Sequence, residues 1–167
     1  SCGSQITTGI ILSGRILKTF NSGRDAFGNM IVNINEYSDI SNGCIQTYSS
    51  TYALVERFID KISKGGNTNI NKSLNNINYK DICIAAEQND QLSISIIKEA
   101  AIAFGIGLVN YIQLLDLKVV ILTGDLPKNS KMFYDLCIKI ASEKLDLNKG
   151  TKVIFEKKEY FAKDTAA

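Results

Sequence analysis

The chain has 167 residues, of which 45% are hydrophobic and 22% are charged, and its formal net charge is +2. This composition is enough for a folded core, argues against disorder and gives no reason to expect nucleic-acid binding by phosphate neutralisation. The sequence contains no histidine, which removes the commonest general base and metal ligand near neutral pH. The length is that of one domain or one lobe of a larger domain, so we interpret residues 1–167 as a single lobe.

The four cysteines form no C-x-x-C pair. Cys83 and Cys137 lie in apolar helical patterns, which predicts buried thiols and a reducing, cytoplasmic location. No signal peptide is visible, and the longest apolar window, around residues 100–117, is interrupted by polar residues and glycines. This window predicts a buried helix and no membrane partner. Both ends have the character of internal sequence, so we expect the chain to be a piece of a longer protein.

The N-terminal third predicts three strands and a helix. Apolar residues 10–12 and 16–17 flank the turn-forming pair Ser13-Gly14, which is typical of a β-hairpin. Alternating apolar residues predict a third strand over residues 30–37. Residues 47–63 carry apolar side chains at three- and four-residue spacing, which predicts a helix.

The rest of the chain alternates between helical and strand patterns. In order, it predicts a polar, Asn-rich surface excursion with a short helix (64–79), a short helix (79–88), a long helix capped by Asn89-Asp90 (to 115), a strand (118–124), a helix (129–145) and a final strand (151–160). The strand at 118–124 is apolar throughout, which favours a central strand covered on both faces. The predicted class is α/β, with a mixed sheet of three antiparallel strands followed by parallel strands, flanked by helices.

Four strings follow one another in order between Gly3 and Pro127: GSQITTGIILSGRIL, AFGNMIVN, NGCIQTYSSTYAL and AFGIGLVNYIQLLDLKVVILTGDLP. Together they resemble motifs of the ROK family of repressors and sugar kinases. The resemblance implies the C-terminal lobe of an actin-like ATPase, or ribonuclease H-like, domain. It also implies that the N-terminal lobe, any helix-turn-helix domain and the last helix lie outside this chain.

The positions that contact sugar hydroxyls in the family are substituted here. The resemblance places them at Ala26, Asn29 and Gln46. Ala26 offers no polar group, whereas the two carboxamides can still donate and accept hydrogen bonds. We therefore expect altered recognition, with a sugar or a sugar derivative as a possible effector.

The family's zinc string is also degenerate. Its three cysteines and a histidine correspond here to residues 37–44 and Asn29, and only Cys44 is kept. One thiol beside an aspartate and an asparagine does not make a closed tetrahedral zinc site, so no metal is predicted. We expect apolar docking of Tyr37 and Ile40 to order this loop instead.

The two nucleotide loops of the family are weakened. The first reads Gly3-Ser4-Gln5-Ile6-Thr7-Thr8-Gly9, in which Gln5 and Thr7 replace glycines. The hydroxyl groups of Ser4, Thr7 and Thr8 remain as possible phosphate donors, but a turn that only packs is the favoured interpretation. The second loop keeps Gly124, a residue that would end a strand even without nucleotide. ATP and Mg²⁺ are therefore not expected as cofactors, and no catalytic residue is assigned.

Three functions remain open at this point. The favoured one is the ligand-sensing and dimerising lobe of a ROK-type transcriptional regulator without catalytic activity, which would reach DNA only through a domain outside this chain. The second is the C-terminal lobe of an ATP-dependent, glucokinase-like sugar kinase, which needs a phosphate cradle, Mg²⁺ and a base. The third is a structural, self-associating lobe that binds no ligand. Homodimerisation is expected, with the long helix as one possible surface.

Overall fold

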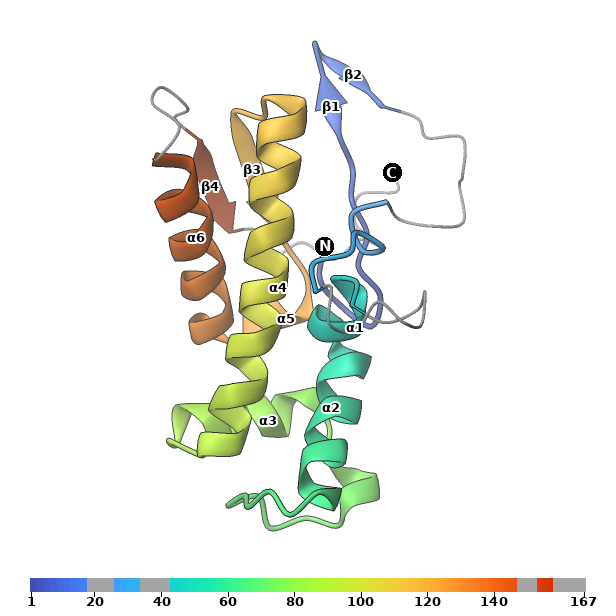
Figure 1. Ribbon diagram of the computed structural model, residues 1–167, viewed down its shortest axis with the longest axis vertical. Coiled ribbons are helices and arrows are strands. Elements are labelled where there is room, and N and C mark those ends of the chain that lie inside the picture. The colour runs from blue at the N-terminus through green and yellow to red at the C-terminus, as the bar shows by residue number, and fades with distance from the viewer. Residues whose placement is uncertain (18–25, 34–42, 147–152, 158–167) are drawn as a thin grey trace.

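The computed structural model describes residues 1–17, 26–33, 43–146 and 153–157. Its centre is the long helix α4 (Gln91–Leu115), and five shorter described helices lie around it, of which α5 packs against α6 (Figure 1). These are α1 (Gln46–Ser49), α2 (Thr51–Ser63), α3 (Tyr79–Glu87), α5 (Asp125–Asn129) and α6 (Lys131–Asp146). The mixed α/β class is confirmed.

The predicted long helix is confirmed, and its ends follow from local chemistry. The Asp90 carboxylate accepts a hydrogen bond from the Ser93 amide at 2.7 Å, which caps the N-terminus. At the other end Asp116 adopts a left-handed conformation (φ 48°, ψ 47°) that stops the helix. α4 is long and apolar enough to cross a membrane, but it packs against α1, α2, α3 and α6. It therefore serves here as the core helix that the sequence predicts.

The helix predicted over residues 129–145 is present but begins later, and a short helix precedes it. α5 ends before Ser130, whose hydroxyl group accepts a hydrogen bond from the Phe133 amide at 3.1 Å. The polar excursion contains a single 3₁₀ turn, Leu74–Asn76, as expected. α3 begins at a capping box in which Asn78 and Asp81 exchange side-chain and backbone hydrogen bonds.

The N-terminal hairpin is confirmed. Strands β1 (Ile11–Leu12) and β2 (Arg15–Ile16) are antiparallel, and Ser13 and Gly14 both have positive φ, as a two-residue hairpin turn requires. The third antiparallel strand is not confirmed. Its described part forms only an isolated bridge between Ile31 and Cys44, and residues 34–37 lie outside the described residues.

Strand β3 (Val119–Leu122) pairs in parallel with β4 (Ile154–Lys157). The prediction that β3 is covered on both faces is wrong for the described structure. Val120 and Leu122 join the core, whereas Val119 and Ile121 are 48% and 52% exposed. One face of β3 therefore packs into the core, and the other face is partly exposed to solvent in the described structure.

A chain of aromatic rings links the hairpin side of the molecule to α6. Phe27 packs edge-on against Phe104 and against Tyr111, each with ring centroids 5.1 Å apart. Phe104 in turn meets Phe133 of α6 at 5.6 Å. Such edge-to-face pairs stabilise beyond simple burial, and they fix the turn at residues 26–29 against α4.

Candidate ligand site

Three loops meet near the start of α1 and α2: residues 2–8, the turn at 26–29 and the turn at Gly124. The Gly3 carbonyl accepts a hydrogen bond from the Thr51 amide at 2.8 Å, which ties the first loop to the start of α2. The Gly3 amide itself donates to the Gln5 carbonyl at 3.1 Å, within the loop. The side chains of Ser4, Thr7 and Thr8 are exposed.

The structure brings the two predicted nucleotide loops into contact. The Cys2 amide donates to the Thr123 carbonyl at 2.8 Å, and the Leu126 amide donates to the Cys2 carbonyl at 3.2 Å. Gly124 lies between Thr123 and Leu126 in the chain and has a φ of +102°. A Cβ on Gly124 would fall 2.6 Å from the backbone N and O atoms of Cys2. Only glycine fits this position, so Gly124 has a structural role that does not depend on nucleotide.

A carboxylate lies where these two loops meet. A Cβ built on Gly3 would be 3.4 Å from Asp125 Oδ2. The Tyr79 hydroxyl of α3 is hydrogen-bonded to the same side chain, and burial together with the negative charge of Asp125 raises the pKa of Tyr79 to about 12. Sequence reasoning did not find this pair, because Tyr79 fits the periodicity of its helix and nothing links it to a turn so far along the chain.

Of the three predicted sugar positions, Gln46 is the one that connects two of the loops by hydrogen bonds. The side-chain Oε1 atom of Gln46 accepts a hydrogen bond from the Ile6 backbone amide at 3.3 Å. The backbone amide of Gln46 donates to the Gly28 carbonyl at 2.8 Å. A Cβ on Gly28 would be 3.3 Å from the same Oε1 atom. The glycine at 28 therefore lets the turn approach Gln46 closely. Asn29 and Ala26 lie on that turn with exposed side chains.

Of residues 37–44, which correspond to the family's zinc string, the structure describes only Gly43 and Cys44. Cys44 is buried, and its Sγ atom lies 3.9 Å from Thr47 Oγ1. Within the described residues, no three His, Cys, Asp or Glu side chains gather closely enough to hold a metal. Tyr37, Asp39 and Ile40 lie outside the described residues, so the docking expected for Tyr37 and Ile40 stays a prediction.

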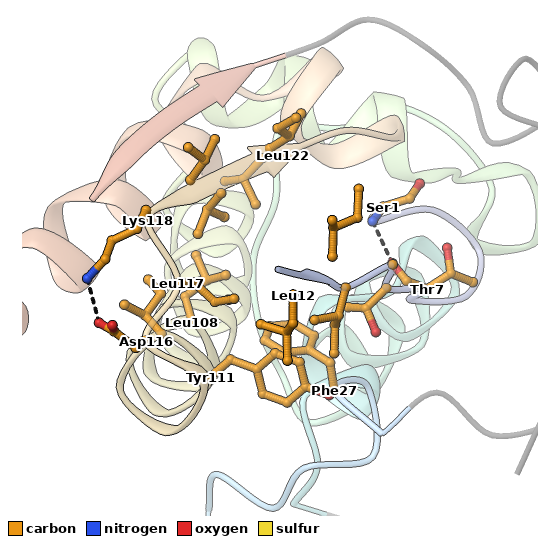
Figure 2. A pocket seen from close by; sticks show the side chains of 18 of the residues that line it. Ser1, Thr7, Leu12, Phe27, Leu108, Tyr111, Asp116, Leu117, Lys118 and Leu122 are labelled. Atoms are coloured by element: carbon orange, nitrogen blue, oxygen red, sulfur yellow. Dashed lines mark hydrogen bonds and ion pairs between the residues drawn. The ribbon is translucent and has the colours of Figure 1, made fainter. Parts of the chain in front are cut away.

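A separate apolar cavity of about 510 Å³ lies between the hairpin and β3 (Figure 2). Its walls are residues 6–13 and 116–122, and its floor includes Phe27, Leu108 and Tyr111. At its rim Lys118 forms an ion pair with Asp116 at 2.7 Å. None of Ala26, Asn29 and Gln46 lines this cavity, although residues 6–8 and Phe27, which belong to two of the three loops, border it.

A sequence profile of the ROK family matches residues 8–165. The chain belongs to the ROK family. No match is found among curated proteins.

Solved ROK structures share this fold. A ROK transcriptional regulator, a homologue of the E. coli MLC protein, superposes with a TM-score of 0.79 at 19% identity, over 96% of this chain and 41% of that one. The ROK hexokinase of Thermus thermophilus superposes with a TM-score of 0.79 at 16% identity, over 98% of this chain and 51% of the hexokinase. A ROK glucokinase of Streptomyces griseus, solved with glucose and AMPPNP, superposes with a TM-score of 0.71 at 22% identity, over 92% of this chain and 53% of the glucokinase. The chain thus spans about half of these ROK proteins, which include both regulators and kinases.

Proposed function

We propose that this chain is the ligand-sensing and self-associating lobe of a ROK-family transcriptional regulator without kinase activity. The observation that carries the proposal is the Asp125 carboxylate beside Gly3. A phosphate-binding turn presents free backbone N–H groups to phosphate oxygens. Here the Gly3 N–H is already bonded within the loop, and a carboxylate close to it would repel a nucleotide phosphate.

The geometry of Gln46 supports a retained effector site. The Oε1 atom of Gln46 is held by Ile6, which orients the carboxamide. Within the described residues its Nε2 group forms no hydrogen bond, so it can donate to a ligand hydroxyl group. A ROK protein of Streptococcus pneumoniae, similar to this chain with a TM-score of 0.73 at 20% identity, was solved with sucrose. Glucose and sucrose are therefore suitable probes.

The same proposal includes the location of the lobe, its oligomeric state and the way in which the protein reaches DNA. The lobe would act in the cytoplasm as a homodimer, and DNA would be bound by another part of the protein. A lobe that only scaffolds is less favoured, because it gives no reason to hold Gln46 between two loops. The kinase alternative draws on the similarity to the glucose- and AMPPNP-bound glucokinase.

The test is ligand titration of the full-length protein by thermal shift and calorimetry. Glucose, sucrose and ATP–Mg²⁺ are compared on the wild type, on Gln46→Ala and on Gln113→Ala, a control glutamine exposed on α4. A sugar at a hundredfold excess over Kd should stabilise the wild type by about 2.7 kcal/mol. We expect this shift to be lost in Gln46→Ala and kept in Gln113→Ala, with no shift from ATP.

Two results would overturn the proposal. An ATP-dependent shift together with formation of a sugar phosphate would identify a kinase. Stabilisation by neither sugar, in a protein that elutes as a dimer, would favour the structural lobe.

A further inference from the structure

We propose that the hydrogen-bonded pair of Asp125 and Tyr79 keeps phosphate groups away from the turn at residues 3–5, and that the side chains of Gln5 and Thr7 do not. The inference rests on the proposed function, in which the lobe uses no ATP, and it names the residues that decide this selectivity. It is carried by the backbone amides of the turn, the position of the carboxylate and the hydroxyl group that holds the carboxylate.

The turn at residues 3–5 is the tip of a tight hairpin with anion-binding character. The Gly3 amide donates to the Gln5 carbonyl at 3.1 Å and closes the tip. Ser4 and Gln5 are exposed there, and within the described residues their backbone amides form no hydrogen bond. Adjacent N–H groups without acceptors favour an anion. The backbone of the turn alone would therefore still accept a phosphate oxygen.

The Asp125 carboxylate is held against this hairpin. A Cβ on Gly3 would lie 3.4 Å from Asp125 Oδ2, and the amide of the next residue, Leu126, donates to the Cys2 carbonyl at 3.2 Å. Burial raises the pKa of the Cys2 thiol to about 12, and the negative charge of Asp125 acts in the same direction. The charge of Asp125 is therefore felt along the hairpin.

Tyr79 fixes the position of this carboxylate. Tyr79 is the first residue of α3, its ring packs against the hydrophobic core, and α3 packs against α4. Its hydroxyl group is hydrogen-bonded to Asp125, and burial together with the charge of Asp125 raises the pKa of Tyr79 to about 12. The phenol therefore stays protonated at neutral pH and remains a donor. Because the donor is anchored in the core, it limits the orientations of the carboxylate and keeps it beside Gly3.

The charge of Asp125 is large enough to decide between phosphate and a neutral ligand. Repulsion between a carboxylate and a doubly charged phosphate group about 5 Å away lowers affinity by about tenfold, even with most of the interaction screened by water. A neutral sugar meets no such penalty. The pair of Asp125 and Tyr79 therefore excludes phosphate without closing the site to hydroxyl groups.

The side chains of Gln5 and Thr7 give no comparable obstruction. Both are exposed, so they can turn away from a ligand. Neither residue has a positive φ, so the backbone of this loop does not require glycine at these positions. The Thr7 hydroxyl group is itself a possible phosphate donor. The replacement of glycine in this loop is therefore not what prevents phosphate binding.

The test titrates the full-length protein with tripolyphosphate and follows the backbone amide signals of Ser4 and Gln5 by NMR. These signals report on this turn, so binding elsewhere in the protein is separated from it. Asp125→Asn removes the charge at nearly constant size, Tyr79→Phe removes only the hydroxyl group, and Gln5→Gly removes the loop side chain. The control is Asp60→Asn, which removes an equal charge from the exposed surface of α2.

We expect Asp125→Asn to bind tripolyphosphate about tenfold or more tightly than the wild type, with shifts of the turn amides. Tyr79→Phe should show a smaller gain, because the carboxylate is kept but is no longer held in place. Gln5→Gly and Asp60→Asn should bind no better than the wild type. A gain in affinity separates this positioning role of Tyr79 from a structural one, because a loss of structure would not produce it.

Three results would overturn the proposal. Equal affinity in Asp125→Asn and Asp60→Asn would leave no role for the position of the charge. A gain in Gln5→Gly that matches Asp125→Asn would assign the exclusion to the loop side chain. If Asp125→Asn is unstable, Tyr79→Phe decides alone, and an affinity equal to that of the wild type rejects the pair. The proposed function fails separately, when the wild type itself forms a sugar phosphate from ATP.

Discussion

Gly107 of α4 lies directly against Ile45, the residue that precedes α1: a Cβ on residue 107 would fall 2.1 Å from Ile45 Cδ1. Ile45 is fully buried, and the Phe27 ring lies 3.3 Å from the same point. The glycine therefore lets the loop that carries Gln46 pack onto the core helix. This contact connects the candidate ligand site to the centre of the fold.

Replacing Gly107 with alanine should destabilise the protein despite the better helix propensity of alanine. Over-packing costs about 1–3 kcal/mol, and propensity returns at most about 1 kcal/mol. The matched control is Gly105→Ala, which gains the same propensity but meets Ile140 at 3.0 Å. Urea unfolding should show the larger loss for Gly107→Ala. Equal stability of the two variants would contradict the role given to the Ile45 contact.

Gly124→Ala should be more damaging than Gly65→Ala. Both glycines have positive φ, +102° and +93°, so each alanine carries a backbone strain of about 1–3 kcal/mol. Gly65 has open space around it, whereas a Cβ on Gly124 meets the backbone of Cys2. The difference in unfolding free energy between the variants measures that contact, and hydrogen exchange in residues 2–8 should rise only in Gly124→Ala.

Stability should fall in alkaline solution because buried thiols resist ionisation. Burial raises the pKa of Cys2 and of Cys83 from 9.0 to about 12. Between these values the folded state binds more protons than the unfolded state, so the free energy of unfolding decreases as pH rises. Below about pH 9 the contribution is fully present. Denaturation across this range should show the decrease, and Cys83→Ala should show a smaller one; an equal decrease would point to other groups.

Asp90 should be a pH-dependent cap. It is 2% exposed and accepts hydrogen bonds from the amides of Ser93 and Asn69, each at 2.7 Å. Burial alone would raise the pKa of Asp90, but these donors outweigh it and hold the pKa below 3.8. Its contribution is therefore present above about pH 4 and is lost as pH falls through the folded-state pKa.

Asp90→Ala should cost about 1–3 kcal/mol at neutral pH, because two buried amides lose their acceptor. The same substitution at the exposed Asp60, which pairs with Lys64 on the surface of α2, should cost less than about 1 kcal/mol. Chemical denaturation at neutral and acidic pH measures both. A loss that stays the same in acid would show that the Asp90 charge is not involved.

Much of the helical structure was predictable because it is encoded locally. Asp90 caps α4 where the sequence predicts, and the Ser13-Gly14 turn forms the expected hairpin. The buried states of Cys83 and Cys137 follow from helical periodicity and are confirmed. In each case the residues that decide the structure are neighbours in the sequence, so a pattern can reveal them.

The arrangement of the sheet was less predictable because it depends on distant partners. The aliphatic run at Val119–Leu122 predicts a strand correctly, but the pattern does not say what lies beside it. In the described structure β4 takes one edge, and the other edge faces the cavity.

The candidate site could be predicted only in part. The family resemblance identifies Gly3, Gly124 and Gln46, which the structure places around neighbouring loops. It did not predict that Asp125 would lie beside Gly3 with Tyr79 hydrogen-bonded to it, because that arrangement depends on the docking of α3 near a turn distant in sequence. The roles of these residues toward a ligand stay predictions.

The apolar character of α4 has a consequence for how the protein must be made in the cell. Until α6 has been synthesised and has docked along Gly105, the apolar face of α4 that packs against α6 is exposed on the nascent chain. Truncated chains that end before residue 131 should therefore be recovered in inclusion bodies or bound to chaperones, even if the hairpin and the first helices form.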